Sequence, residues 1–92
     1  MSVMNKVRFA DYISLVSSYV KYYQNDDGTW TADASVLPGC ITWGSSRSEA
    51  VIMAKDAIES WIMAALRFGD EIPIIDDCIL QDNVDEFLKL PK

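Results

Sequence analysis

The side chains that most often carry out catalysis are scarce in this 92-residue chain, which contains no histidine. The Ser–His and Cys–His pairs that activate a nucleophile are therefore absent, and no Gly-rich phosphate-binding pattern occurs. Asp26 and Asp27 lie beside a tight turn, where aspartate usually hydrogen-bonds the backbone, and Asp33 lies on the polar side of a predicted strand. Asp76 and Asp77 could contribute to a metal site, but a two-metal site needs several carboxylates from separate elements. We therefore expect no catalytic residue, no metal and no cofactor, and predict that the protein is not an enzyme.

The two cysteines, Cys40 and Cys78, show no metal-binding spacing, which makes a zinc site improbable. A reactive thiolate needs a nearby cation or helix N-terminus. Neither is predicted beside Cys40, so we interpret it as a small buried apolar residue. We expect two free thiols, no signal peptide and no membrane span, and thus a cytoplasmic protein. A disulfide between the two cysteines is left open.

The net charge of −6 and the pI of about 4.3 argue against direct nucleic-acid binding, which needs a basic face. Such a charge instead favours a basic protein partner. Base stacking by the aromatic residues is also not expected, because only Lys21 lies among them. We predict packing roles in the core and the hairpin for Trp30, Trp43 and the tyrosines at positions 19, 22 and 23.

Apolar spacing predicts a short helix over residues 7–18 and a strand that begins near Tyr19. A turn follows at residues 25–28, where Gly28 can take a positive φ. Alternation over residues 29–35 predicts a second strand with Trp30, Ala32 and Ala34 on one side. Residues 37–39 end that strand, and residues 40–43 form a third strand that stops at Gly44.

A capping box predicts the start of a long helix, with the Ser46 hydroxyl on the Glu49 amide and the Glu49 carboxylate on the Ser46 amide. The helix runs to Phe68, and Gly69 ends it. One stripe is expected to face the sheet: Ala50, Ala54, Ala57, Ile58, Trp61, Ala65 and Phe68. Residues 71–75 and 78–80 are predicted to be extended, and residues 82–88 could add one or two helical turns.

The polar side of this helix also contains apolar residues. Ile52 and Met63 fall among its charged positions, close to Asp56 and Glu59. Single exposed apolar residues are common, but two on one stripe indicate a surface for a partner. We predict partner binding by Ile52, Asp56, Glu59 and Met63, and leave random scatter as the alternative.

Residues 26–65 combine an Asp27-Gly28 turn, a strand led by Trp30, a turn at residues 37–40, a strand that ends in Gly44, and a helix that opens with Glu49-Ala50. In this order the segment resembles the HicB antitoxin family, a HicB-like group of UPF0150 type. The resemblance depends on a combination of turn, strand and helix-start residues whose order is specific although each piece alone is weak. These family signature residues are expected to be structural: Asp27, Gly28, Trp30, Leu37, Pro38, Gly39, Cys40, Thr42, Gly44, Glu49 and Ala50.

The resemblance implies an α+β, partial RNase H-like fold in the order β-β-β-α-β. A three-stranded antiparallel sheet with a further edge strand would pack against one long helix, and we add a short N-terminal helix. We expect one domain over residues 1–92, with a helical extension (1–18), a core (19–80) and a tail (81–92). The tail has twelve residues after Leu80, which is too few for the C-terminal DNA-binding domain of many HicB proteins.

The resemblance also implies a function. The chain would be the antitoxin-like member of a type II toxin–antitoxin system, binding and neutralising a small, basic HicA-type toxin that cleaves RNA. It would form a homo-dimer or a homo-tetramer. One alternative is an orphan, self-assembling accessory or structural protein without a toxin partner. Another is a metal-dependent nuclease remnant that depends on Asp33.

Overall fold

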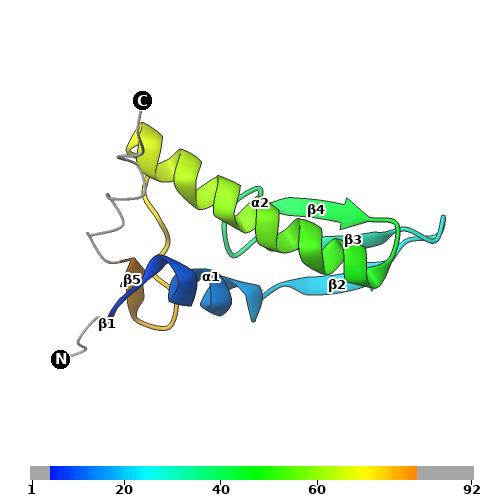
Figure 1. Ribbon diagram of the computed structural model, residues 1–92, viewed down its shortest axis with the longest axis horizontal. Coiled ribbons are helices and arrows are strands. Elements are labelled where there is room, and N and C mark those ends of the chain that lie inside the picture. Colours follow the sequence, from blue (N-terminus) through cyan, green and yellow to red (C-terminus); the bar gives the residue numbers. More distant parts are fainter. Residues whose placement is uncertain (1–4, 81–92) are drawn as a thin grey trace.

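The computed structural model describes residues 5–80, which form two helices and five strands around two apolar clusters (Figure 1). One end of the molecule consists of a sheet and the first half of the long helix. The other end consists of the short helix, a parallel pair of strands and the second half of the long helix. The elements in chain order are β1 (Asn5–Val7), α1 (Phe9–Ser17), β2 (Lys21–Gln24), β3 (Trp30–Asp33), β4 (Ile41–Gly44), α2 (Arg47–Phe68) and β5 (Cys78–Leu80).

The predicted three-stranded antiparallel sheet is confirmed, in the order β2-β3-β4. The turn between β2 and β3 uses Gly28 at φ 89°, and the Asp27 carboxylate accepts the Thr29 amide at 2.9 Å. Strand β2 begins at Lys21, two residues after the predicted strand start at Tyr19. The Tyr19 and Val20 amides still donate to carbonyls at the end of α1, so that turn must close before the chain can extend.

Helix α2 begins and ends where the sequence predicts. Ser46 Oγ accepts the Glu49 amide at 3.1 Å, and Gly69 ends the helix in the left-handed region at φ 74°. The second half of the predicted capping box is wrong in its partner. The Glu49 carboxylate accepts the Ser45 amide at 2.8 Å, which ties the helix start to the end of β4.

The first half of α2 lies very close to the sheet. Ala50 and Ala54 pack against Ala32 of the central strand, and all three are buried. A Cβ at Gly44 would lie only 2.6 Å from the Ala50 nitrogen. Small residues on both sides therefore set this short separation.

The second half of α2 packs mainly against other elements. Ile58 and Ile62 join a larger cluster with Tyr12, Val16 and Leu37, all of which are fully buried. The prediction that Phe68 faces the sheet is wrong, because it is 74% exposed. Phe68 is the last residue of α2, whereas Ile62, six residues earlier, is fully buried.

The N-terminal helix is confirmed, but it is shorter than predicted, because Val7 belongs to β1. The further strand, β5, also forms. It pairs in parallel with β1, with Val7 opposite Leu80, and makes a two-stranded sheet separate from the three-stranded one. The observed architecture confirms the α+β class. The helical turns predicted at 82–88 and the tail lie outside the described residues.

Candidate protein-interaction surface

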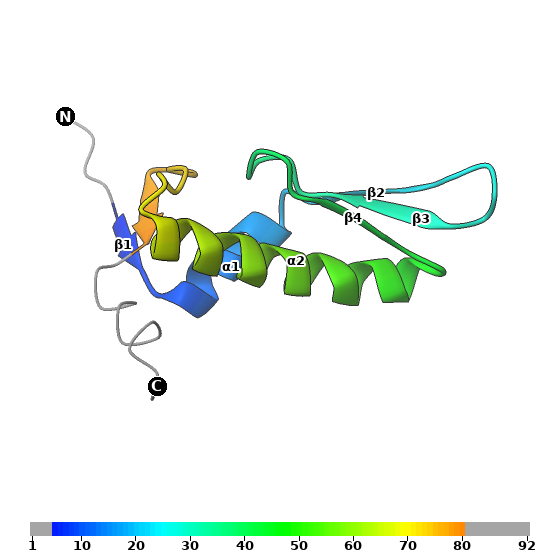
Figure 2. The ribbon, with the colours of Figure 1, turned by 90° about the horizontal axis from the view of Figure 1, so that it is seen from above.

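The three-stranded sheet has one covered face and one open face. Figure 2 shows α2 along one side, while no helix or strand of residues 5–80 lies along the other. Side chains alternate along a strand, so residues adjacent to the buried Ala32 and Ala34 point to the open side. We call this surface the open face, and it consists of Lys21, Tyr23, Thr31, Asp33, Ile41 and Trp43.

An apolar strip runs across the open face. Tyr23, Thr31 and Trp43 are direct neighbours on the three strands. The exposed fractions are 49% for Tyr23 and 63% for Trp43, and Ile41 in the adjacent row is 56% exposed. Large exposed aromatic side chains grouped in this way are typical of protein-binding surfaces.

The packing roles predicted for the aromatic residues are confirmed for Trp30 and Tyr22 and are wrong for Tyr19, Tyr23 and Trp43. Trp43, Tyr19 and Tyr23 are exposed, whereas Trp30 and Tyr22 lie on the helix side, against the small cluster. The Arg47 guanidinium carbon lies 5.1 Å from the centre of the Tyr22 ring. Residues 5–80 cover the sheet on one side only, so the large side chains on its other side are not buried by this part of the chain.

The hairpin end of the open face is hollowed. A shallow cavity of about 300 Å³ is lined by Asn25, Asp27, Thr29, Thr31 and Trp43. The Asn25 amide donates to both threonine hydroxyls, at 3.0 Å and 2.9 Å. These hydrogen bonds hold the polar lining in place beside the indole ring.

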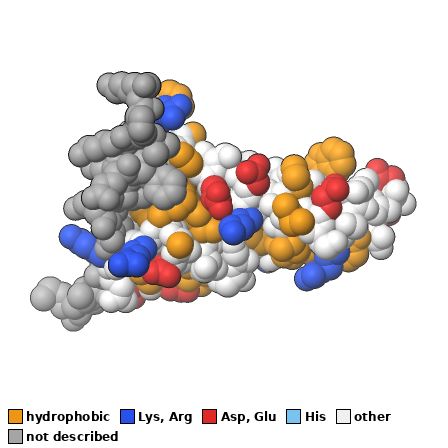
Figure 3. All heavy atoms as spheres, viewed as in Figure 1, with side chains coloured by type: hydrophobic (Ala, Val, Ile, Leu, Met, Phe, Trp, Pro, Cys, Tyr) orange, Lys and Arg blue, Asp and Glu red, His pale blue; other side chains and the backbone are white. Residues whose placement is uncertain are grey.

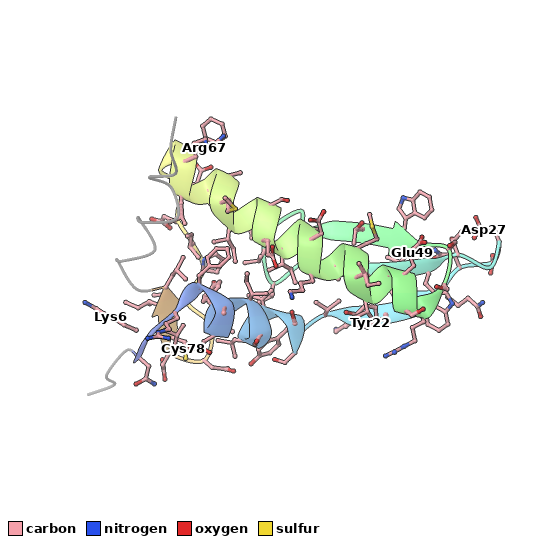
Figure 4. All side chains as sticks on the ribbon, in the orientation of Figure 1. Lys6, Tyr22, Asp27, Glu49, Arg67 and Cys78 are labelled. Atoms are coloured by element: carbon pink, nitrogen blue, oxygen red, sulfur yellow. The ribbon has the colours of Figure 1, made fainter. Side chains whose placement is uncertain are left out.

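Two carboxylates flank the strip. Hydrogen bonds from the side chain and amide of Thr29 hold the pKa of Asp27 below its ordinary value. Hydrogen bonds from Ser35, together with the charge of Lys21, do the same for the pKa of Asp33. Both therefore stay ionised at neutral pH. Figure 4 shows Asp27 at the hairpin tip, remote from α1.

The helix surface predicted from the sequence lies on the other side of the molecule. Ile52 is 68% exposed and Asp56 is exposed, but Met63 and Glu59 are half-buried. Glu59 lines a cavity of about 310 Å³ shared with α1. Figure 3 looks onto this side, where hydrophobic and charged side chains alternate. Partner binding at these four residues stays a prediction.

Several family signature residues have clear structural roles. Leu37 and Cys40 are buried, Gly39 has φ 79°, and the Pro38 carbonyl accepts the Trp61 indole N–H at 2.9 Å. Burial raises the pKa of the Cys40 thiol, and both cysteines are free. Thr42 is half-buried and lies opposite Ala32.

Sequence reasoning missed the open face as a binding surface. The available signal was the alternation that placed Ala32 and Ala34 on the covered side, because it also assigns Tyr23 and Trp43 to the opposite side. Within residues 5–80, no group of three or more acidic or cysteine side chains could hold a metal ion. None of the helices described is long and apolar enough to cross a membrane.

Comparisons with known proteins place the chain in a family. No family model matches it, and no solved structure matches it significantly. The chain is similar to the UPF0150 protein Ta0767 of Thermoplasma acidophilum, with 32% identity over 63 residues. The matched region covers 68% of this chain and 81% of that relative. The chain therefore belongs to the UPF0150 family, which is HicB-like.

Proposed function

We propose that this protein is a non-catalytic antitoxin of a type II toxin–antitoxin system. It acts in the cytoplasm, where it binds a small, basic, RNA-cleaving toxin of HicA type and neutralises it. The observation that carries the proposal is the open face, on which Tyr23 and Trp43 are exposed beside two ionised carboxylates. Membership in a HicB-like family supports the class of partner.

The apolar strip supplies the contacts that hold a bound partner, chiefly through Tyr23 and Trp43. Tyrosine and tryptophan are over-represented among the residues that dominate binding energy, because they bury a large area with few rotatable bonds. Both side chains extend from a sheet that is fixed to α2. Little conformational order would therefore be lost when a partner docks.

The carboxylates supply the long-range attraction. Asp26, Asp27 and Asp33 lie at or beside the open face, and Lys21 opposes them. Their net negative charge adds to the −6 of the whole chain. A basic toxin would be drawn to this surface before contact, which raises the association rate.

The test combines binding with rescue of growth. The protein is co-expressed with a small, basic HicA-type toxin, and affinity is measured with the purified pair. Tyr23→Lys should weaken binding by about tenfold or more and abolish rescue. Asp33→Asn should slow association and reduce its dependence on salt.

Two lysine substitutions on α2 provide the comparison. Ser60→Lys places the same charge on an exposed helix position and should leave binding unchanged. Ile52→Lys examines the helix surface predicted from the sequence. If Ile52→Lys abolishes binding while Tyr23→Lys does not, the toxin docks on α2 and the open-face proposal is wrong. If the wild-type protein neither binds the toxin nor rescues growth, the antitoxin function itself is wrong.

A further inference from the structure

Strand β4 forms one edge of the three-stranded sheet, and it lacks the usual protection of an edge strand. Exposed edges normally carry charged residues or proline, which prevent pairing with another chain. No charged residue lies between Asp33 and Arg47, and Pro38 precedes the strand. The opposite edge, β2, carries Lys21 and leads into Asp26. The two edges therefore differ in their ability to accept another strand.

The backbone of β4 offers hydrogen-bonding groups on its outer side. The Ala34 amide donates to the Cys40 carbonyl at 2.9 Å. Since hydrogen-bonded pairs recur at every second residue of an antiparallel ladder, Thr42 and Gly44 direct their amides and carbonyls toward β3. Ile41 and Trp43 direct theirs outward. The Ile41 amide donates to the Gly39 carbonyl at 3.1 Å, which leaves the Trp43 amide and the Ile41 carbonyl facing the edge.

This outward ladder has a defined end. The next outward amide, that of Ser45, is already bound to the Glu49 carboxylate at 2.8 Å. A strand that joins the edge can therefore pair with residues 41–43 only. Such a short pairing must be supplemented by side-chain contacts.

We propose that a second copy of this chain pairs with β4, antiparallel, around a two-fold axis through Thr42. In that register Ile41 of each copy lies opposite Trp43 of the other, so the pair occurs once on each side of the axis. Each Trp43 amide donates to the Ile41 carbonyl of the other copy. The two three-stranded sheets become one continuous sheet, and the two open faces join on the same side.

The occupant is argued from charge and from symmetry. Two chains of net charge −6 repel each other, so they can meet most easily along residues 34–46, which carry no charged side chain. The Glu49 carboxylate at the end of this edge is already engaged by the Ser45 amide. A basic partner gains nothing from this neutral edge and is attracted to the acidic hairpin instead. The register is also self-complementary, because it brings an aromatic residue opposite a β-branched one in both halves, which is a favourable cross-strand pair.

Apolar area beside the edge supplies the remaining contact. Ile41 and Trp43 are 56% and 63% exposed, and Met53 is 40% exposed on α2, one turn after Glu49. Figure 3 shows hydrophobic side chains gathered at the β4 edge. Each contributes twice in a symmetric dimer. This inference goes beyond toxin binding and holds whether or not a toxin is present.

The experiment measures mass and backbone protection as a function of concentration. In sedimentation velocity across the micromolar range, the wild-type protein should approach twice the 10.3 kDa of one chain. Ile41→Lys, which places a charge at the edge, should shift the protein to the mass of one chain. The matched control is Tyr23→Lys, the same change on β2, which should remain dimeric although it weakens toxin binding.

Amide hydrogen exchange of the wild-type protein tests the same strand pairing without a variant. Its result therefore does not depend on whether the Ile41→Lys protein folds. The Trp43 amide should exchange more slowly as concentration rises, while the Thr31 amide within the sheet should not respond. A single-chain mass at the highest concentration would overturn the proposal, as would a Trp43 exchange rate that does not depend on concentration. Dissociation by Tyr23→Lys with Ile41→Lys still dimeric would show that the open faces stack, and would overturn it as well.

Discussion

Tyr19 and Asp76, which lie 57 residues apart in sequence, are joined by a hydrogen bond in which the phenol oxygen is 2.6 Å from both carboxylate oxygens. Tyr19 connects α1 to β2, and Asp76 belongs to the turn that leads into β5. Both Asp76 and Asp77 have positive φ, at 50° and 60°. A side-chain link thus holds a turn of unfavourable backbone conformation against the start of the sheet.

The first prediction concerns this link. Tyr19→Phe should lower the free energy of unfolding, and Asp76→Asn should lower it too. The double variant should be less destabilised than the sum of the two, because each removes the same bond. Urea denaturation of the four proteins measures this coupling. Strict additivity would mean that the bond does not contribute to stability.

The close approach of Gly44 to α2 gives a prediction about packing. In Gly44→Ala the new methyl group would lie 2.6 Å from the Ala50 nitrogen, so helix and sheet must separate. We expect the free energy of unfolding to fall by about 1–3 kcal/mol. Ser45→Ala, at the next and exposed position, is the control and should change it by less than about 0.5 kcal/mol. Equal effects in urea denaturation would contradict the tight packing described here.

The buried phenol of Tyr12 predicts sensitivity to alkali. It donates a hydrogen bond to the Pro73 carbonyl, and burial raises its pKa to about 12 from an ordinary value of 10.0. Between pH 10 and pH 12 the unfolded chain loses the phenol proton while the folded chain keeps it. The contribution of Tyr12 to the free energy of unfolding is therefore fully present below pH 10 and falls as the pH rises. The expected loss is about 1–2 kcal/mol.

Unfolding in urea at several pH values above 9 measures this loss. Tyr12→Phe should show a smaller decline over the same range. The decline that remains includes Tyr19, whose pKa is raised by its hydrogen bond to Asp76. If the variant and the wild-type protein lose stability in parallel, Tyr12 is not the group responsible.

The carboxylates of Asp27 and Asp33 predict that stability falls in acid, the opposite of the effect of Tyr12 in alkali. The pKa values of Asp27 and Asp33 lie below 3.8 in the folded protein, because hydrogen bonds favour the charged form. Their contribution is present above about pH 4 and is lost as the pH falls through the lowered pKa values. Stability measured from pH 7 to pH 3 should decline less in Asp27→Asn than in the wild-type protein, and an unchanged slope would exclude this role.

The two thiols predict an order of chemical labelling. Cys40 is 4% exposed and burial raises its pKa, so little thiolate is available for reaction. Cys78 is half-buried at the start of β5. A thiol reagent at neutral pH should modify Cys78 first and Cys40 only as urea unfolds the chain. Mass spectrometry of peptides identifies the modified residue, and equal rates would contradict the burial of Cys40.

Local sequence signals predicted most of the secondary structure. The turn at Gly28, the cap at Ser46 and the stop at Gly69 act over a few residues, and the structure confirms all three. The alternation around Ala32 also predicted correctly which side of the central strand is buried. The similarity to a UPF0150 protein confirms that the chain belongs to a HicB-like family, as the signature residues indicated.

The sequence by itself determined where the strands turn and where the long helix begins and ends, because the responsible interactions join neighbours in the chain. Only the tertiary structure decided that β5 pairs with β1, that Ile62 rather than Phe68 is covered, and that Tyr23 and Trp43 stay on an open face. Each of these outcomes depends on which element arrives from a distant part of the chain. A short apolar segment fits several such neighbours equally well, so its own residues cannot select among them.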